Sequence, residues 1–368
     1  MPRLIKTKNE EIYRAMNIEK LYGEQKDNLW GGRRLIDKYG KKSDKEIVAE
    51  SWELSFHKDG PTKLSDSRTL MEAVSPCELG KNIADFSDFP MMIKLIDAKE
   101  NLSVQVHPDD DYAMAHEASY GKTEMWYIVE ADEGAGIYLG FNRDLQKEEL
   151  LTAIKENTLT DIMNFIPVSK GDCYFIPAGT IHAIGAGCLI YEIQQSSNIT
   201  YRVYDYGRVD KNGKQRELHV DKAMDVLKLK RYVKNSLCAD VLGISKYFTL
   251  EKKVINGENV KISPDVCSFR CITVIDGCGT LNSMPVSQGD SYFVCATEKE
   301  VILSGEMTAL VASLRKYGVG TETINGVAHA YIYNDLSERI IEAVGEDETD
   351  AKKKVMELAN LTENDITI

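Results

Sequence analysis

Short apolar runs bounded by turn residues dominate the middle of the chain, and they predict β-strands. The runs are rich in Val, Ile, Tyr and Phe, and each lies close to Gly, Pro or Asp. This spacing favours a sandwich or barrel of strands over alternating strand–helix units. The predicted strands include Met91–Ile96, Leu102–Val106, Met125–Val129, Gly136–Gly140, Asp172–Pro177, Cys188–Gln194 and Thr200–Tyr204.

Helical spacing of apolar residues interrupts the strand pattern in three places, and one of them, His219–Tyr232, predicts a helix that leads to the second half of the chain. Residues 142–166 carry Leu and Ile among charges at helical spacing, which predicts a small helical insertion between strands. Residues 236–318 return to short β-type runs. In the last fifty residues, apolar side chains between Asn334 and Leu361 again follow helical spacing around an acidic segment. We therefore expect residues 319–368 to form a mostly helical extension.

A faint internal repeat divides the predicted strands into two sets. The segments Gly171-Asp-Cys-Tyr-Phe-Ile-Pro-Ala and Gly289-Asp-Ser-Tyr-Phe-Val-Cys-Ala lie 118 residues apart and agree at five of eight positions. Each is a Gly-Asp turn that leads into an aromatic and apolar strand, so we expect the same β-sandwich unit twice. The predicted fold is all-β, with a first domain at 1–235, a second at 236–318 and the extension at 319–368.

The net charge is strongly negative but unevenly distributed. The chain has 45 Lys and Arg against 58 Asp and Glu, a formal net charge of −13. Residues 1–318 hold 41 basic and 47 acidic side chains (−6), whereas residues 319–368 hold 4 and 11 (−7). An acidic balance argues against a nucleic-acid partner, which requires a basic face. It still allows a local basic pocket for a small anionic substrate.

The sequence predicts a cytoplasmic protein without a membrane partner. The N-terminus has no apolar run long enough for a signal peptide, and no stretch approaches the ~20 apolar residues of a membrane span. The eight cysteines form no Cys-x-x-Cys pair, and Cys173 and Cys295 lie in apolar runs. We therefore expect reduced thiols rather than disulfides.

Two histidines lie in contexts that indicate a metal site. The spacing G-x5-P-x-G-x2-H, which runs from Gly171 to His182, resembles the second signature motif of the cupin β-barrel. In that motif the Pro-x-Gly turn reverses the chain and directs the next strand's His into the barrel. If the residues around Gln105 form a strand, Gln105 and His107 point to the same face because side chains alternate with a period of two.

A longer series of motifs resembles type I phosphomannose isomerase in its short bacterial form. The most specific pieces are Val-Gln-Val-His-Pro around His107 and Gly-Lys-Thr-Glu-Met-Trp ending at Trp126. The resemblance covers residues 10–318 and leaves the C-terminal extension outside. It implies two cupin-type β-sandwich (jelly-roll) domains, of which the first, 1–235, is catalytic. The remaining pieces, in chain order, are Trp30-Gly31, Ala49-Glu50-Ser51-Trp52, Pro90-Met-Met-Ile-Lys94-Leu and Tyr201-Arg202.

The resemblance implies a zinc site of one Gln, two His and one Glu. These ligands correspond here to Gln105, His107, Glu124 and His182. The chemistry of the side chains agrees, because imidazole nitrogens with carboxylate or amide oxygens suit Zn²⁺, Fe²⁺ or Mn²⁺. The usual first cupin motif carries His-x-His, whereas Gln105 replaces the first His here and Glu124 follows His107 by 17 residues. This departure is characteristic of the isomerase family and disfavours a cupin metal oxygenase.

The implied reaction interconverts mannose 6-phosphate and fructose 6-phosphate through a cis-enediolate, with one zinc ion per chain as the cofactor. By resemblance, Arg202 is a guanidinium aimed at the developing negative charge. Lys122 and Lys94 are candidates for proton handling or phosphate contact, Ser103 is a candidate donor to the phosphate, and Glu50 corresponds to an active-site glutamate of the family. We expect Arg202, Lys122 and Glu50 to be catalytic, and Lys94 and Ser103 to bind the substrate.

Two positions depart from the expected motifs. Eukaryotic-type members of the family have an Asp four residues before the Arg as a proposed acid–base group, whereas Asn198 stands there in this chain. An amide cannot abstract a proton, so the sequence does not identify the base. In the second half, counting the cupin motif from Gly289 puts Cys295, Thr297 and Glu300 where Pro, Gly and His would fall. We therefore expect the second domain to bind no metal.

Two other functions compete with the isomerase. One is a non-catalytic, sugar-phosphate-binding regulatory cupin, and the other is a cupin metal oxygenase. Retention of Arg202 beside the ligand set favours the isomerase, because a sensor has no need of a guanidinium next to the metal. The expected partner of the site is a small sugar phosphate, and the acidic extension is a candidate surface for a protein partner.

Overall fold

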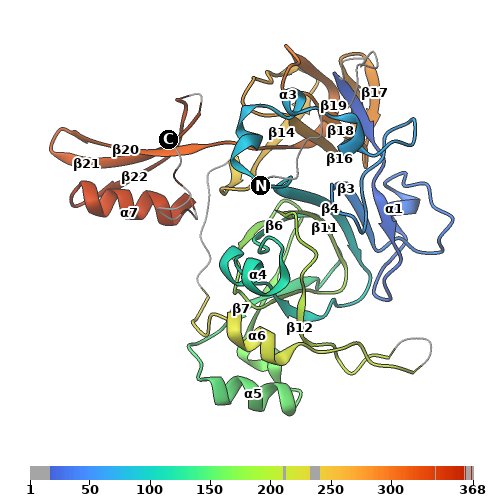
Figure 1. The fold of residues 1–368 in the computed structure, drawn as a ribbon, viewed down its shortest axis with the longest axis vertical. Helices are drawn as coiled ribbons and strands as arrows, with labels where there is room; N and C mark the ends of the chain where they lie inside the picture. The colour runs from blue at the N-terminus through green and yellow to red at the C-terminus, as the bar shows by residue number, and fades with distance from the viewer. Residues whose placement is uncertain are drawn as a thin grey trace. The chain divides into compact units, whose positions relative to one another are not determined.

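The computed structural model describes residues 17–209, 213–232, 241–335, 337–359, 361 and 366. The chain forms two compact units (Figure 1). The first unit consists of residues 23–60 and 91–234, and the second unit contains the residues up to 22, residues 61–90 and residues from 235 onward. Regular structure in both units is mostly antiparallel β-strand, which confirms the prediction of a mainly β fold.

Two antiparallel sheets build the first unit, and all seven strands predicted above belong to them. The six-stranded sheet has the order β2 (Glu24–Lys26), β3 (Glu50–Leu54), β4 (Met91–Ala98), β11 (Cys188–Gln195), β6 (Glu124–Ala131), β9 (Cys173–Ile176). The five-stranded sheet has the order β12 (Tyr201–Tyr204), β5 (Val104–Val106), β10 (His182–Ile184), β7 (Gly136–Phe141), β8 (Met163–Pro167).

The two sheets of the first unit share one apolar core. Trp126 and Ile190 from the six-stranded sheet cluster with Ile137 and Ile184 from the five-stranded sheet. Because side chains alternate along a strand, these residues line the inner faces of the two sheets, and the residues next to them in each strand lie on the opposite face. The first unit is therefore a β-sandwich.

Short helices connect the strands of the first unit. The predicted helical insertion at 142–166 is confirmed for α5 (Lys147–Lys155) and the 3₁₀ turn η2 (Leu159–Ile162), whereas the residues from Met163 form β8. The remaining helices are α1 (Arg34–Asp37), α4 (Asp110–Glu117) and α6 (Val220–Val226).

An eight-stranded antiparallel sheet dominates the second unit, and its core is almost entirely aliphatic. The main path of the sheet is β1 (Ile18–Leu21), β18 (Ser291–Val294), β16 (Arg270–Leu281), β19 (Val301–Ser313), β14 (Thr249–Asn256), β13 (Val241–Ile244). Two further strands pair with it: β15 (Val260–Ile262) with β19 and β17 (Met284–Ser287) with β16. Outside the C-terminal extension, the helices of this unit are α2 (Leu70–Ala73), α3 (Pro76–Leu79) and the 3₁₀ turn η1 (Lys81–Asp85).

The Gly-Asp turns of the internal repeat have the same backbone geometry in both units. The Gly171 N–H donates to the Ile128 carbonyl, and the Gly289 N–H donates to the Val274 carbonyl, both at 2.8 Å. In each turn the Asp that follows accepts a hydrogen bond from the N–H three residues earlier, at 2.9 and 3.1 Å. The sequence repeat therefore marks a repeated turn and strand.

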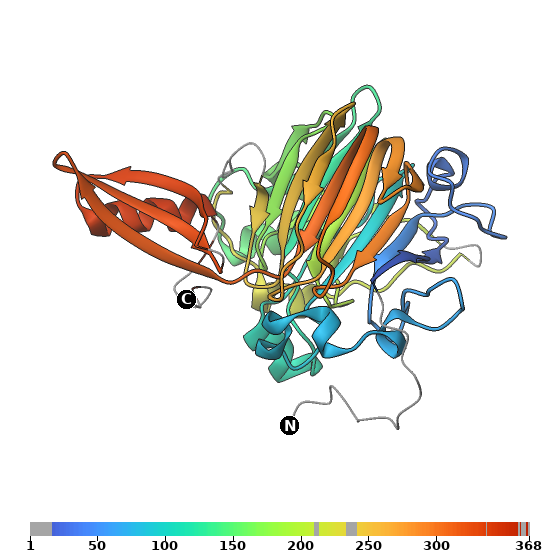
Figure 2. The ribbon, with the colours of Figure 1, turned by 90° about the horizontal axis from the view of Figure 1, so that it is seen from above.

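The C-terminal extension is a three-stranded sheet with one helix, so the prediction of a mostly helical segment at 319–368 is wrong. Its antiparallel strands are β20 (Tyr317–Ile324), β21 (Val327–Asn334) and β22 (Arg339–Gly345). Among the described residues of the extension, only α7 (Glu348–Ala359) is helical, and it lies along one face of the sheet (Figures 1 and 2). Ala330 and Ile332 of β21 share a buried core with Val355 of α7 and with Ile244 of β13.

Residues 17–22 and 61–90 belong to the second unit, although the sequence placed them in the first domain. β1 pairs along its full length with β18. The N–H groups of Lys81 and Asn82 donate to the carbonyls of Val266 and Cys267, both at 2.9 Å. These contacts join segments far apart in the sequence, which local patterns of polarity cannot reveal.

The seven cysteines that the structure describes form no disulfide with one another, and Cys238 lies outside the described residues. Cys188 and Cys295 are buried, whereas Cys77 and Cys278 are exposed. No helix of the described residues is both long enough and apolar enough to cross a membrane.

Candidate metal centre

The Pro-x-Gly turn before His182 positions both histidines of the predicted site. Gly179 has a φ of +83°, a conformation that residues with a Cβ rarely adopt. Its N–H donates to the His107 carbonyl at 2.8 Å. A Cβ on Gly179 would lie only 2.8 Å from the Val226 carbonyl oxygen, so glycine is required here. His182 then opens β10, where it pairs with Gln105 of β5.

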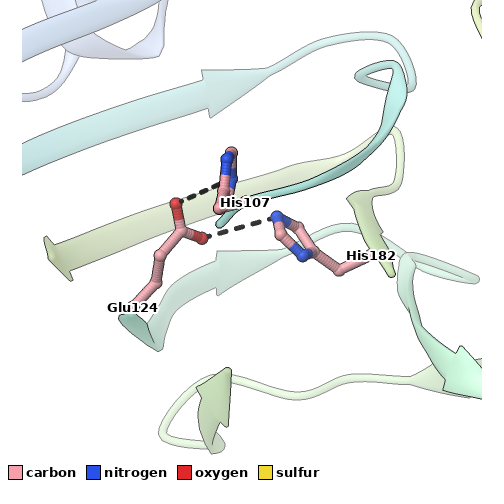
Figure 3. A group of neighbouring side chains, drawn as sticks. All are labelled: His107, Glu124 and His182. Carbon is pink, nitrogen blue, oxygen red and sulfur yellow. Dashed lines mark ion pairs between the residues drawn. The ribbon is translucent and has the colours of Figure 1, made fainter. Parts of the chain in front are cut away.

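Three of the four predicted metal ligands meet in a buried cluster (Figure 3). Nε2 of His107 lies 3.2 Å from Oε1 of Glu124, and Nε2 of His182 lies 3.5 Å from Oε2 of the same carboxylate. All three side chains are at most 1% exposed. Among the described residues, this is the one group of three or more His, Cys, Asp or Glu side chains spaced to hold a metal ion.

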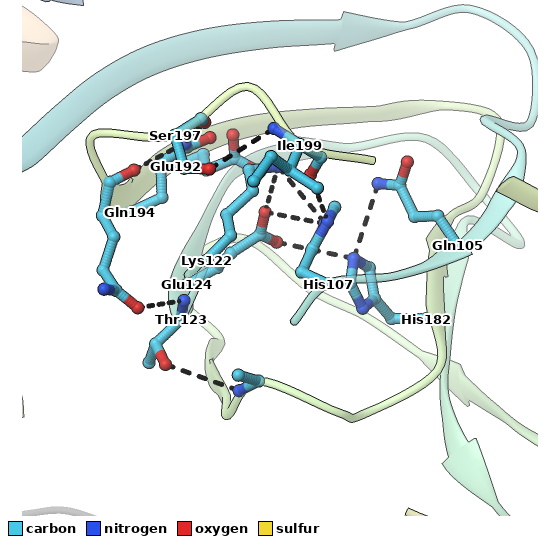
Figure 4. A network of polar contacts seen from close by, with 12 residues as sticks. Gln105, His107, Lys122, Thr123, Glu124, His182, Glu192, Gln194, Ser197 and Ile199 are labelled. Atoms are coloured by element: carbon cyan, nitrogen blue, oxygen red, sulfur yellow. Dashed lines mark hydrogen bonds and ion pairs between the residues drawn. The ribbon is translucent and has the colours of Figure 1, made fainter. Parts of the chain in front are cut away.

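Main-chain carbonyls orient both imidazole rings. Nδ1 of His107 donates to the Ile199 carbonyl at 2.8 Å, and Nδ1 of His182 donates to the Thr180 carbonyl at 2.9 Å. Because Nδ1 carries the proton in each ring, Nε2 presents its lone pair to the cluster. Gln105 is the fourth predicted ligand. Nε2 of its side-chain amide lies 3.4 Å from Nε2 of His182 (Figure 4).

Lys122 neighbours the cluster and sets its electrostatics (Figure 4). Its Nζ lies 2.5 Å from Oε1 of Glu124 and 3.3 Å from Nε2 of His107. Although burial raises it, Lys122 and then His107 lower the pKa of the Glu124 carboxyl well below its usual value. Burial and the Lys122 ammonium lower the pKa of His107 to about 3, and burial lowers the pKa of His182. The cluster therefore offers one carboxylate and two neutral imidazoles, the protonation states that bind a divalent metal.

The donor set fits a divalent metal ion of borderline hardness. Both oxygens of Glu124 are buried; Oε1 faces the Lys122 ammonium at 2.5 Å, and no described residue donates a hydrogen bond to Oε2. Buried polar atoms in native structures nearly always have a hydrogen-bond partner, so Oε2 is suited to bind a metal ion. Two imidazole nitrogens, a carboxylate and an amide oxygen form a set that Zn²⁺, Fe²⁺ or Mn²⁺ accepts.

A polar cavity of about 290 Å³ opens beside the cluster, and Gln105 and Lys122 line it. All of its lining residues belong to the first unit. The structure therefore brings the remaining predicted site residues to the same cavity as the candidate ligands. These residues are Glu50, Lys94, Ser103 and Arg202.

Comparisons with known proteins cover most of the chain. Residues 18–156 match the catalytic domain of type I phosphomannose isomerase. The mannose-6-phosphate isomerase of Streptococcus mutans is 34% identical over 310 residues, which make up 79% of this chain and 96% of that protein. The chain belongs to the type I phosphomannose isomerase family.

Solved structures of phosphomannose isomerases share the fold. The mannose 6-phosphate isomerase from Bacillus subtilis superposes with a TM-score of 0.71 at 32% identity, covering 81% of this chain and 99% of that one. A mannose 6-phosphate isomerase with bound zinc and yttrium superposes with a TM-score of 0.65 at 16% identity, with the same coverage. This family member is therefore longer than these relatives, and about a fifth of it lies outside the matched region.

Arg202 lines the cavity of this family member, and its guanidinium has no carboxylate partner among the described residues. Its Nη1 donates to the Glu217 carbonyl at 2.8 Å, and its Nε donates to Oγ of Ser103 at 3.3 Å. Burial and the neighbouring Arg216 guanidinium lower the pKa of Arg202. Arg216, by contrast, is held by the Asp205 carboxylate through Nε at 2.8 Å and Nη2 at 2.6 Å. This corner therefore has a surplus of positive charge, which suits an anion.

Lys94 forms ion pairs with two carboxylates, which makes it a weaker candidate for phosphate contact than Arg202. Its Nζ lies 3.3 Å from Oε1 of Glu192 and 3.7 Å from Oε2 of Glu50. Although burial lowers it, Glu192 and then Glu50 raise the pKa of Lys94. The carboxylate of Glu50 in turn accepts hydrogen bonds from Nδ2 of Asn28 at 2.7 Å and Nε1 of Trp52 at 2.8 Å. These hydrogen bonds fix the Glu50 carboxylate next to Lys94.

Glu192 is a cavity residue that the sequence motifs did not identify. It is 3% exposed, and its Oε2 accepts a hydrogen bond from Nε1 of Trp126 at 3.0 Å. Its Oε1 faces Lys94 and the cavity. Burial and the charge of Glu124 raise the pKa of Glu192. One sequence signal existed: it is the single charged residue of the predicted strand Cys188–Gln194.

Proposed function

We propose that the protein is a zinc-dependent isomerase that interconverts mannose 6-phosphate and fructose 6-phosphate through a cis-enediolate. The observation that carries this proposal is the buried cluster of His107, Glu124 and His182 beside a cavity that also holds Arg202. Curated relatives that match nearly their whole length are named mannose-6-phosphate isomerases. A protein of the same fold has been crystallised with zinc.

Gln105, His107, Glu124 and His182 would hold the metal in this proposal. When bound, Zn²⁺ supplies Lewis-acid stabilisation of negative charge on substrate oxygens. The chain itself keeps both imidazoles neutral and oriented, because each Nδ1 proton is fixed on a main-chain carbonyl. Lys122 lies at the boundary of cluster and cavity, where its ammonium can donate to a substrate oxygen.

Glu192 is the proposed base for the carbon-bound proton. A base for this step needs a dry environment and a pKa closer to neutrality than that of an ordinary carboxyl, and burial supplies both. Lys94 and Nε1 of Trp126 hold the two oxygens of Glu192 in place. Glu50 then acts through Lys94, so we assign it a positioning role rather than direct chemistry.

Arg202 is the proposed partner of the charge that develops on the substrate oxygens. It lies directly opposite Gln105 in the pairing of β12 with β5, so its backbone adjoins the proposed metal site. A guanidinium held in a partly desolvated cavity stabilises an oxyanion more strongly than one in water. Ser103, which accepts a hydrogen bond from Arg202, remains the proposed donor to the phosphate.

An isomerase assay on metal-stripped protein tests the proposal. Turnover of mannose 6-phosphate should be lost on chelation and restored by stoichiometric Zn²⁺, with metal content near one ion per chain. Absence of zinc-restored turnover on mannose 6-phosphate, in protein that stays folded, contradicts the proposal. Tight binding of mannose 6-phosphate without turnover would instead identify the regulatory cupin, and calorimetric titration separates the two results.

A further inference from the structure

Three carboxylates line the cavity among the described residues, and they differ in how they are held. Glu50 is fixed by two donors, and Glu192 is buried between Trp126 and Lys94. Asp59 lies at the mouth of the cavity, where its side chain is 47% exposed. It is the most exposed of the three, since the side chains of Glu50 and Glu192 are 14% and 4% exposed.

Asp59 is held by its loop and by Asn198. Its Oδ2 accepts a hydrogen bond from Nδ2 of Asn198 at 3.2 Å. Its backbone N–H donates to Nδ1 of His57 at 3.2 Å, and its carbonyl accepts a hydrogen bond from Nζ of Lys26 at 2.7 Å. No described residue bonds to Oδ1, so this oxygen is available to a substrate.

The proposed reaction contains two proton transfers with different requirements. Hexose phosphates are mostly cyclic, so the ring must open before the carbon-bound proton moves. Transfer from carbon requires a strong base shielded from water, whereas transfer between hydroxyl oxygens tolerates an exposed group. The dry Glu192 suits the first transfer. The exposed carboxylate of Asp59 suits the second.

We propose that Asp59 is the acid–base group that opens the sugar ring, with Asn198 holding its second oxygen. This inference rests on the proposed isomerase function. The Asp59 carboxylate takes the proton from O1, and the electron pair left on O1 forms the C1=O1 double bond. The C1–O5 bond breaks with its electron pair going to O5, and the carboxylic acid of Asp59 returns the proton to O5. Nothing is oxidised or reduced, and Asp59 ends in its starting form.

Exchange of the two hydrogen-bonded side chains tests this role in the zinc-loaded enzyme. Asp59→Asn keeps the shape of the side chain but removes the base, so kcat on mannose 6-phosphate should fall about tenfold or more. Combining Asp59→Asn with Asn198→Asp places a carboxylate on the other side of the same hydrogen bond, and most of the lost rate should return. Lys58→Gln, a change in the same loop outside the cavity lining, should keep the wild-type rate.

A deuterium isotope effect at C2 distinguishes ring opening from carbon chemistry. When ring opening becomes slow in Asp59→Asn, the effect with 2-deuterated mannose 6-phosphate should fall toward one, and the exchanged double variant should restore it. An unchanged kcat in Asp59→Asn, or a lost rate with an undiminished isotope effect, would overturn the proposal. So would a double variant that binds zinc but recovers no activity. An inactive zinc-loaded wild type overturns the isomerase function itself, which is a separate result.

Discussion

At the residue scale, the same type of side chain has different roles because its neighbours differ. Glu124 is surrounded by two imidazoles and an ammonium and stays ionised. Glu192 lies on the neighbouring strand with one indole N–H and one lysine, and burial raises its pKa instead. These environments are why we propose one glutamate as a metal ligand and the other as a base within one sandwich.

Replacing Arg202 with Ala should lower kcat at least about tenfold, because the developing oxyanion loses its cation. The zinc content should stay near one per chain, since Arg202 bonds to Ser103 and a main-chain carbonyl and not to a candidate ligand. Steady-state kinetics and metal analysis of the same preparation provide the measurement. If zinc is lost together with activity, Arg202 supports the metal site rather than the chemistry.

Replacing Glu192 with Gln should reduce kcat by about a hundredfold or more, because an amide cannot take the carbon-bound proton. Trp126 can still donate to the amide oxygen, so folding and zinc content should be preserved. The exchange of the C2 proton with solvent, followed by NMR, should slow in parallel with turnover. Glu50→Gln is the matched comparison on the other side of Lys94, and it should cost less. Equal losses in both variants would remove the distinction between base and positioning residue.

Candidate site residues could be predicted from the sequence where they lie in a motif of characteristic spacing. Gln105, His107 and His182 lie in short, specific motifs, and alternation along one strand already placed two of them on the same face. Glu192 was missed because its proposed function depends on burial between two strands, and burial of a single charge is a property of tertiary packing. Asp59 was missed because its contact with Asn198 joins two loops 139 residues apart.

At the element scale, strands with Gly, Pro or Asp at their ends were predictable and the tail was not. Buried residues alternate along β21, as Ala328, Ala330 and Ile332 show. The helical interpretation began at Asn334, after this alternation had ended, and took Ile340 and Ile341 as one helical face. A short segment with two adjacent β-branched residues fits both the helical period of 3.6 residues and the strand period of two. Pairing with β21 therefore decides that residues 339–345 form a strand.

The end of β19 and the start of β16 are joined by a charged contact that should make stability depend on pH. Asp265 bonds to Arg270 and Arg315 at 2.8 and 2.6 Å. Although burial raises it, Arg315 and then Arg270 lower the pKa of Asp265 from 3.8 to about 2. A carboxyl with a depressed pKa in the folded state stabilises the fold above pH 4 and loses this effect as the pH falls through 2. The contribution is about 2 kcal/mol.

Asp265→Asn should therefore lower the free energy of unfolding at pH 7, and the deficit should shrink as the pH approaches 2. Urea unfolding of both proteins across this pH range measures the difference. Asp66→Asn, which removes an exposed carboxylate paired with Arg68, is the control and should change little. A deficit that does not depend on pH would show that packing, and not ionisation, gives Asp265 its effect.

At the scale of the whole molecule, the cavity and the acidic extension are separate in the sequence. Every residue that lines the cavity lies in 23–60 or 91–234, whereas β20, β21, β22 and α7 start at Tyr317. The extension has its own apolar core, which also covers Ile244 of β13. The division into domains was harder to predict than the strands. Residues 61–90 belong to the second unit through contacts with residues beyond 235, and the strands of the first unit lie between these segments in the sequence.

A chain that ends at Gly318 should keep its zinc and retain kcat/KM within about twofold, because every candidate ligand and every residue that lines the cavity precedes the extension in the sequence. Its melting temperature should fall, since Ile244 loses the cover of Ala330 and Val355. Kinetics and thermal unfolding of the truncated chain provide the test. Loss of activity in a truncated protein that is still folded would show that the extension takes part in the reaction.

The neutral amide of Gln105 has a consequence for the charge balance of the site. With Zn²⁺ in the proposed position, two neutral imidazoles, one amide and one carboxylate leave the centre with a single positive charge, and Lys122 adds a second. A phosphate monoester carries close to two negative charges near neutral pH. The centre would therefore add its positive charge to that of Arg202 at the same cavity, which reduces the cost of bringing a dianion into a desolvated site. A negatively charged ligand in place of Gln105 would remove half of the positive charge that the centre and Lys122 supply together.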